Sequence, residues 1–244
     1  IHVLRSARRF HILVVSRSEG NMFYKQTNPK LLAIVVISLL ALAQMGCATS
    51  YRTQDSTTLT LQAEPPLVLQ IDPLFRPLKP LLFPIESLTD VDRRVFVHSD
   101  DKGAVLRLVI VQFERVQPGT GFKFTYPAKP PAEFGAQIYR FGAYVHDDEA
   151  EAADAPAKEA GQTRALLLAN GFNVPKVFRV ARLARVADQN GATEIILLYM
   201  EAADTDFPTR PLPMADEDGD VLLNEADARS LFTRMKSVIT PVSG

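Results

Sequence analysis

The chain contains one cysteine, Cys47, and none in the long remainder from Ala48 to Gly244. A fold in that part of the chain can contain no disulfide bond and must be held together by its hydrophobic core. A domain of this length buries roughly 70% of the surface that its unfolded chain exposes, which is enough without covalent cross-links. The sequence therefore predicts a single domain with a substantial core.

An apolar run lies just before this cysteine. It extends from Leu31 to Ala43, is interrupted only by Ser38, and follows Lys25 and Lys30. A basic flank, a short apolar stretch and small residues after it are the layout of a secretory signal peptide. A membrane-spanning helix needs about 20 apolar residues, so this run is too short for a permanent span.

The Gly46-Cys47 pair at the end of the run resembles the lipid-attachment motif of bacterial lipoproteins. Those proteins usually have leucine three residues before the cysteine and a small residue two before it, whereas this chain has Gln44 and Met45. The resemblance implies cleavage before Cys47, a lipid such as palmitate on that residue, and anchorage in the bacterial cell envelope. Ala48 after the cysteine implies sorting to the outer membrane, facing the periplasm, with the membrane and another envelope protein as partners.

Two other cleavage sites remain open. Ala41 and Ala43 form a small-x-small pair, as do Gly46 and Ala48, and cleavage at either would release a soluble secreted protein. The first methionine is Met22. We therefore expect residues 1–21 to be upstream or fragment residues and residues 22–47 to be the signal peptide.

The charge of the chain changes once this segment is set aside. The whole chain has 27 basic and 28 acidic residues, of which residues 1–47 hold six basic and one acidic, so the remainder carries a net charge of −6. Binding to nucleic acid needs several convergent Lys and Arg side chains, so the sequence argues against a nucleic-acid partner. Membrane association is expected to come from the N-terminal anchor alone.

A proline-rich stretch follows a polar segment. Residues 48–64 are expected to be a tether, and residues 65–90 an extended arm with prolines at 65, 66, 73, 77, 80 and 84. Proline fixes φ and removes a hydrogen-bond donor, which argues against a helix or a central strand. The many leucines and phenylalanines of the arm favour a role in covering the core, with partner binding in polyproline II form as the alternative.

The remaining part, residues 91–244, has the pattern of an α+β domain. The strand pattern predicts two hairpins, one turning at residues 99–103 and one at Asp188–Gly191, where Asn-Gly is a strong turn signal. Helices are expected at Lys158–Asn170, ended by Gly171, and at Asn224–Ile239, with Asn224 as N-cap. The predicted strands are Arg93–His98, Ala104–Val116, Phe122–Tyr126, Phe134–His146, Val177–Val186 and Ala192–Ala203.

These elements give the order β-β-β-β-α-β-β-α. That order predicts an antiparallel sheet with helices on one face. Strands that are apolar on both faces, such as Val105–Phe113 and Ile195–Met200, need cover on both sides. We therefore expect the proline-rich arm to lie on the other face.

The sequence contains no Gly-rich phosphate loop, no G-x-S-x-G and no H-E-x-x-H, so we expect a binding or scaffolding domain without a cofactor. The alternative is a metal-dependent hydrolase built on His98 and His146, each of which precedes acidic residues. The simpler interpretation is two strand ends rich in turn-forming aspartates.

An acidic segment before the last helix resembles an EF-hand calcium loop. Its ligands would be Asp216, Asp218, Asp220 and Glu225, with Gly219 at the sharp turn. The first ligand position holds Met214, which has no side-chain oxygen, and the prolines before it cannot form the entering helix. A solvated acidic turn is the alternative.

Charged residues within the predicted strands are the third candidate site. A cluster of Glu114, Arg140 and Glu201 would be either a binding site or an ion pair at a sheet edge, because buried charges must be paired. Arg182 and Glu194 are further strand-borne charges, and Tyr139, Tyr144 and Tyr199 are candidates to line the same region. Alternation along a strand leaves about half of such positions facing water, so a structural role is the alternative.

Overall fold

The computed structural model describes residues 51–53, 57–61, 63, 66–126, 131–203 and 221–242. The chain divides into two compact units, Ile1–Ala48 and Thr49–Gly244, and all described residues belong to the second. Cys47, the apolar run and Asp216, Asp218 and Asp220 lie outside the described residues.

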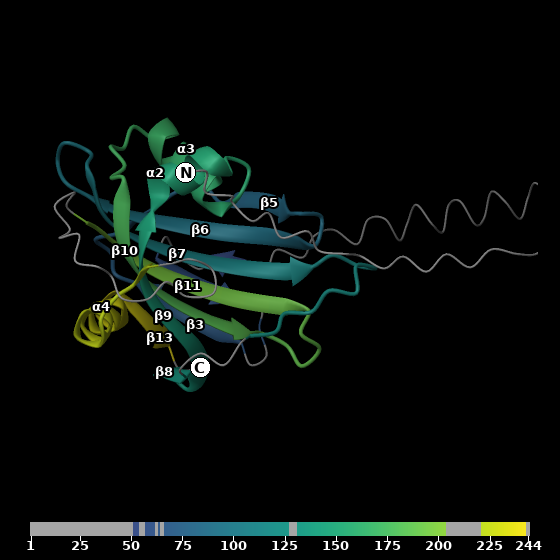
Figure 1. Ribbon diagram of the computed structural model, residues 1–244. Coiled ribbons are helices and arrows are strands. Elements are labelled where there is room, and N and C mark those ends of the chain that lie inside the picture. Colours follow the sequence, from purple (N-terminus) through teal and green to yellow (C-terminus); the bar gives the residue numbers. More distant parts are fainter. Residues whose placement is uncertain are drawn as a thin grey trace, which may run out of the picture. The chain divides into compact units, whose positions relative to one another are not determined.

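Two antiparallel sheets form the described fold (Figure 1). The small sheet has the order β1-β2-β3-β13, and the large sheet has the order β12-β9-β10-β11-β7-β6-β4, with β5 on β6 and β8 on β9. The small sheet comprises β1 (Tyr51–Thr53), β2 (Thr58–Leu61), β3 (Leu67–Ile71) and β13 (Ile239–Val242). The large sheet comprises β4 (Arg76–Pro77), β5 (Leu81–Ile85), β6 (Thr89–Ser99), β7 (Val105–Val116), β8 (Pro131–Phe134), β9 (Gln137–Asp147), β10 (Val177–Val186), β11 (Thr193–Ala202) and β12 (Val221–Leu222).

Three helices complete the described part: α2 (Asp148–Asp154), α3 (Glu159–Ala169) and α4 (Glu225–Val238). The expected α+β class and the mainly antiparallel sheet are therefore present. The order of elements is longer than predicted. The strands β1–β5 precede β6, the acidic segment after β9 forms α2, and β12 and β13 flank α4.

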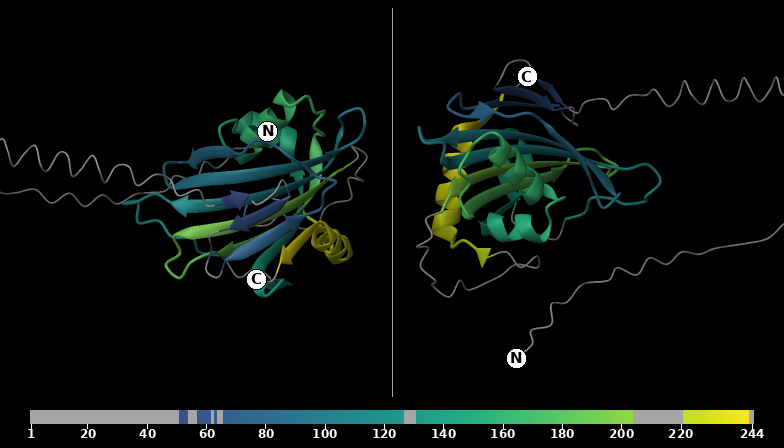
Figure 2. Two further views of the ribbon diagram at one scale, coloured as in Figure 1. Left: turned by 180° about the vertical axis from the view of Figure 1, so that it is seen from behind. Right: turned by 90° about the horizontal axis from the view of Figure 1, so that it is seen from above.

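The large sheet is covered on both faces. Alternate residues of β10 belong to two cores, since Ala181 and Leu183 pack toward the small sheet and α4, whereas Phe178 and Val180 pack toward α3. Figure 2 shows the small sheet and the α2–α3 pair on opposite sides of the large sheet. We call these the sandwich face and the helix face. The prediction that all helices share one face is wrong, because α4 packs on the sandwich face through Leu231 and Met235.

The N-terminal segments belong to the fold rather than to a tether. The strands β1 and β2 lie within the expected tether, and Leu59 and Leu61 are buried. The proline-rich arm does cover the core, as expected, through Leu69 and Phe75. However, its segment β3 is an inner strand, between β2 and β13, contrary to the prediction. The prolines flank this short strand, so all its amide groups remain available for pairing.

Two predicted strands differ in the structure. Phe134–His146 is split into the hairpin β8–β9 at Gly135, which has a φ of 61° that glycine adopts without strain. Phe122–Tyr126 forms no strand and lies in an irregular loop, which donates a hydrogen bond from the Phe124 amide to the Gly191 carbonyl at 2.9 Å. Periodicity alone could not distinguish this docked loop from a strand.

Local signals for turns and caps are confirmed. The Asp188 carboxylate accepts hydrogen bonds from the amides of Asn190 and Ala192, which closes the turn between β10 and β11. The Asn224 side chain accepts from the Asp227 amide and so caps α4. Gly171 follows α3 with a φ of 80°, as expected for a C-terminal stop.

Candidate functional site

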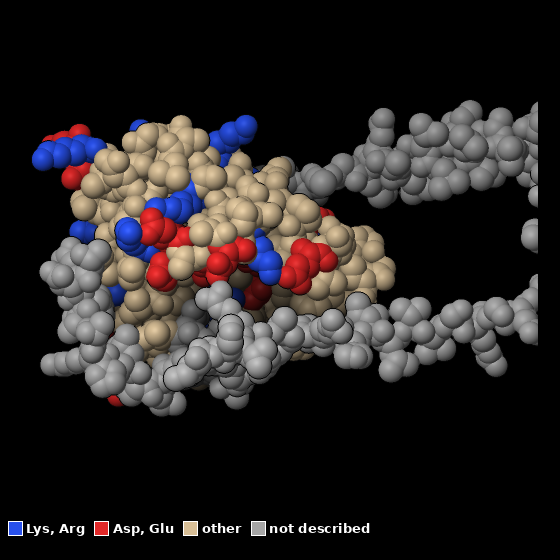
Figure 3. Space-filling model, turned by 45° about the horizontal axis from the view of Figure 1, so that its top comes forward, with Lys and Arg blue, Asp and Glu red and all other residues tan. Residues whose placement is uncertain are grey.

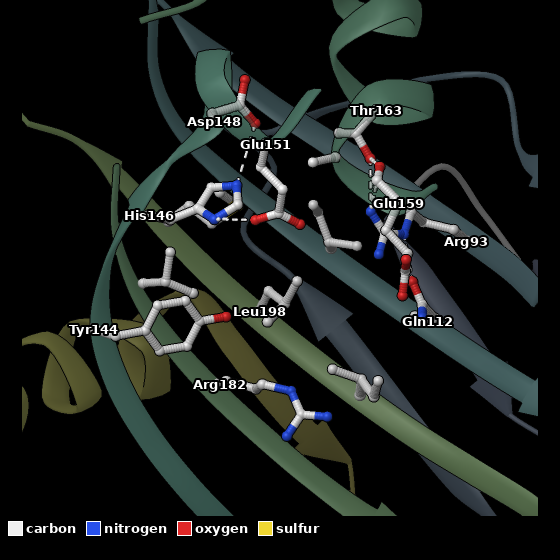
Figure 4. A pocket seen from close by; sticks show the side chains of 15 residues that line it. Arg93, Gln112, Tyr144, His146, Asp148, Glu151, Glu159, Thr163, Arg182 and Leu198 are labelled. Carbon is white, nitrogen blue, oxygen red and sulfur yellow. Dashed lines mark hydrogen bonds and ion pairs between the residues drawn. The ribbon is translucent and has the colours of Figure 1, made fainter. Parts of the chain in front are cut away.

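A cavity of about 370 Å³ lies between the helix face of the large sheet and the α2–α3 pair. We call it the helix-face pocket. Its floor is apolar and comes from three adjacent strands, β7, β11 and β10; the floor residues are Ile110, Val180, Ile196, Leu198 and Met200. Polar side chains surround this floor, and Figure 4 shows them converging from the strands and the two helices. An apolar floor with a few convergent polar groups is typical of small-molecule sites.

One wall of the pocket is formed where β9 continues directly into α2. His146 is near the end of the strand, and Asp148 and Glu151 occupy the first turn of the helix, which Asp147 caps through the Ala150 amide. The His146 Nδ1 atom lies 3.1 Å from Glu151 Oε2, and its Nε2 atom lies 3.6 Å from Asp148 Oδ1. Arg164 of α3 also pairs with Asp148 at 2.7 Å. The imidazole therefore lies between two carboxylates.

These partners favour the charged imidazolium. Burial by itself lowers the pKa of His146, but the hydrogen bonds and charges of Asp148 and Glu151 outweigh it and raise the pKa to about 9. Conversely, His146 lowers the pKa of the Glu151 carboxyl below its usual value, against the opposing effect of burial. At neutral pH the pair is a histidinium and a carboxylate, which suits binding better than general-base catalysis.

The opposite wall is held by Arg93 of β6. Its guanidinium donates to the side chain of Gln112, to the Thr163 hydroxyl at 2.7 Å and to the Glu159 carbonyl at 2.9 Å, which fastens α3 to the sheet. Gln112 then donates to Glu114 Oε1 at 2.5 Å. Arg93 and Gln112 are both buried. This network orients the wall without leaving its polar groups unsatisfied.

Two buried carboxyls face each other beyond this wall. Glu114 of β7 and Glu194 of β11 are directly opposite in register and are 6% and 5% exposed. Glu114 accepts from Thr89 at 3.2 Å, while Glu194 accepts from Tyr126 and lies 3.6 Å from Arg182 Nη2. Burial raises the pKa of Glu194 to about 7, although Arg182 and Tyr126 oppose the increase. Burial also raises the pKa of Glu114.

Charge on the outside of the helix layer is mixed. Figure 3 shows acidic side chains gathered over the helices, with basic side chains beside them. Two ion pairs join opposite charges near the helix layer: Lys158 pairs with Glu86 at 2.6 Å, and Lys176 pairs with Glu149 at 2.9 Å. The α2–α3 layer itself has more acidic than basic side chains.

The structure does not bring the two predicted histidines together. His98 packs against Phe75 with its ring tilted and the ring centroids 5.6 Å apart, and Phe75 belongs to the sandwich-face core. His146 is paired in register with Phe178, which belongs to the helix-face core. The two histidines lie on opposite faces of the sheet, with β10, β11 and β7 between their strands.

The calcium-loop candidates are only partly described. Asp216, Asp218 and Asp220 lie outside the described residues. Glu225 is described, begins α4 and pairs with Arg229 at 2.5 Å on the helix surface. Within the described ranges, no group of three or more His, Cys, Asp or Glu side chains is arranged to hold a metal ion.

The predicted cluster of strand charges is divided between the two faces. Glu114 and Arg140 belong to the helix face, whereas Glu201 accepts from Tyr199 and from Arg234 of α4 on the sandwich face. Of the tyrosines, only Tyr144 lines the pocket. The sequence analysis named Arg182 and Glu194 as strand-borne charges but did not predict that the two side chains lie together. It missed Arg93 and Gln112, for which the sequence offers no signal beyond alternation along strands. It also missed Glu151 and Thr163, which lie on α2 and α3.

Comparison with protein-family models, with curated proteins and with solved structures finds no match. Among the residues that the structure describes, no helix is both long and apolar enough to cross a membrane. Any functional conclusion therefore depends on the pocket and on the sequence around Cys47.

Proposed function

We propose that this chain is a lipid-anchored protein of a bacterial cell envelope whose domain binds a small amphipathic ligand in the helix-face pocket. The observation that supports binding is the pocket itself: a cavity of about 370 Å³ with an apolar floor and polar walls. A ligand would place its apolar part on the floor and its polar groups against His146, Glu151, Tyr144 and Arg182. Binding or scaffolding is the proposed role, with no cofactor.

The proposed anchor has separate support in the sequence. A basic flank, the apolar run from Leu31 to Ala43 and the Gly46-Cys47 pair occur in the order that lipidation requires. The acyl chains on Cys47 would hold the protein to the outer membrane, and the domain would face the periplasm. The tether would be shorter than residues 48–64, since β1 begins at Tyr51.

Lipidation is tested by the intact mass of the protein from a bacterial host, together with membrane fractionation. We expect a chain that begins at Cys47 and carries a diacylglyceryl or triacyl increment, found in the membrane fraction. The Cys47→Ser variant should lose both the increment and the membrane association. An unmodified soluble chain that begins at Gln44 or Thr49 would overturn the anchor and indicate a secreted protein.

Ligand binding is tested with N-phenyl-1-naphthylamine, a neutral apolar fluorophore, titrated into the Cys47→Ser chain, which has no acyl chains to bind the probe. We expect saturable fluorescence that weakens at least about tenfold when Leu198→Arg is added, because a charged side chain then occupies the apolar floor. The matched control is Leu168→Arg, since Leu168 is 54% exposed on α3 and lies outside the pocket. Equal binding by both variants would show that the probe binds elsewhere.

A further inference from the structure

Arg182 of β10 presents a guanidinium to the helix-face pocket that its neighbours only partly neutralise. It lines the pocket, its side chain is 28% exposed, and it donates no hydrogen bond to another described residue (Figure 4). Its ion pair to Glu194 joins Nη2 and Oε1 at 3.6 Å, which is longer than a hydrogen bond. Burial raises the pKa of Glu194 to about 7, so this carboxyl is partly protonated at neutral pH. The guanidinium of Arg182 therefore has donors left for a ligand.

The other charged side chains at the pocket are engaged by protein partners. Arg93 donates to three acceptors of its own wall, and His146 lies between two carboxylates. Glu159 also lines the pocket, and it has the positive charge of Arg93 beside it, because Arg93 donates to its carbonyl oxygen at 2.9 Å. We therefore expect the charged group of a ligand at Arg182 rather than at these side chains.

The register of the sheet places Arg182 directly beside the apolar floor. Arg182 is opposite Leu198 of β11, and Leu198 is opposite Ile110 of β7, so the three side chains form one row across the helix face. On its other side Arg182 is opposite Gly142 of β9, where an added Cβ would meet no described atom within 4 Å. A glycine inside a strand often marks the close approach of a ligand. The guanidinium thus has open space beside it at one end of an apolar row.

We propose that the ligand of the helix-face pocket is an alkyl-chain oxyanion, whose carboxylate or phosphate group pairs with Arg182 beside Gly142. Its chain would lie on the floor toward Val180 and Met200, the next register pair, away from Glu194. This ligand class rests on the proposed function, which is ligand binding in the same pocket. A guanidinium presents a planar fork of N–H donors that matches two oxygens of a carboxylate or phosphate.

The test is displacement of N-phenyl-1-naphthylamine from the Cys47→Ser chain by four alkyl compounds that differ in headgroup: decanoate, decyl phosphate, decanol and decyltrimethylammonium. At least one of the two anions should displace the probe at concentrations at least about tenfold lower than decanol, because its headgroup forms charge-assisted hydrogen bonds. Burial of the chain alone would favour the uncharged decanol. The stronger of the two anions identifies the headgroup. No preference over decanol, or a preference for the ammonium compound, would overturn the inference.

Two substitutions locate the headgroup, each judged by the ratio of anion to decanol binding within one variant. Arg182→Gln should abolish the preference for the anion, since the charged fork is removed. Gly142→Val should fold, because valine suits a strand and its Cβ meets no described atom, and it should reduce the preference by filling the space beside Arg182. The matched control is Arg115→Gln, which removes one positive charge from an exposed side chain outside the pocket and should keep the preference. An unchanged preference in Arg182→Gln would overturn the inference, and if that variant does not fold, an unchanged preference in Gly142→Val would do so.

Failure of this ligand class and failure of the pocket give different results. Probe fluorescence that does not saturate, or that is unaffected by Leu198→Arg, would overturn ligand binding in the pocket and the ligand class with it. Saturable binding that depends on Leu198, with equal displacement by the anions and decanol, would overturn the ligand class alone.

Discussion

The free energy of unfolding of this domain should decrease by several kcal/mol as the pH is raised from 4 to 10. The buried Glu194 and the half-buried His146 hold protons more tightly in the folded state than in the unfolded chain: the pKa of Glu194 is raised from 4.5 to about 7, and that of His146 from 6.5 to about 9. A group with a raised pKa in the folded state stabilises the fold below its unfolded pKa, and this contribution is lost as the pH rises through the folded value. Urea unfolding across this pH range measures the decrease.

Single substitutions separate the contributions of Glu194 and His146 to this pH dependence. Glu194→Gln should match the unaltered protein near pH 4 and exceed its stability at pH 8 by up to about 3 kcal/mol, because the glutamine carries no charge to bury. His146→Gln should behave in the opposite way: it should be up to about 3 kcal/mol less stable at pH 6, and the difference should vanish near pH 10. Parallel pH profiles for the variants and the unaltered protein would show that neither group has a raised pKa.

Phe178→Ala should be the most destabilising of the substitutions considered, at about 3–5 kcal/mol, because it leaves a cavity in the helix-face core. Phe178 is fully buried and belongs to the same cluster as Leu167, Phe172 and Met200. The loss should also weaken probe binding, since this cluster supports the α2–α3 layer above the pocket. Chemical denaturation of the purified variant measures the change in free energy.

The matched control for this prediction is Leu168→Ala. Leu168 lies next to Leu167 in α3 but is 54% exposed, so its truncation should change the free energy of unfolding by no more than about 0.5 kcal/mol. A loss below about 1 kcal/mol in Phe178→Ala would mean that α3 does not pack on this part of the sheet.

Features that depend on neighbouring residues could be predicted from the sequence. The hairpins β6–β7 and β10–β11, the C-terminal stop of α3 at Gly171 and the Asn224 cap of α4 follow from turn chemistry and short-range periodicity. The same local reasoning failed for α2, whose acidic first turn was interpreted as a strand end rich in turn-forming aspartates. It also failed for the segment Phe122–Tyr126, whose alternating aromatics are typical of a strand.

The candidate site shows most clearly what could not be predicted from the sequence. Alternation along β10 places Arg182 on the opposite face from Arg179 and Arg185, as the pairing of the sheet shows. The pattern could not indicate which of these residues would be buried, or what would lie opposite. The carboxyls of Glu114 and Glu194 are far apart in sequence and become cross-strand neighbours only through the register of β7 and β11.

The sequence by itself determined that the part after Cys47 contains no disulfide, and it predicted a mainly antiparallel fold. The resemblance of the segment ending at Cys47 to a lipoprotein signal stays a prediction. Only the tertiary structure decided that β3 is an inner strand, because its second partner is β13, which comes from the other end of the domain. It also decided where the charges are buried. Strand alternation places side chains on one face or the other, but their burial and their pKa values depend on which distant segment covers that face.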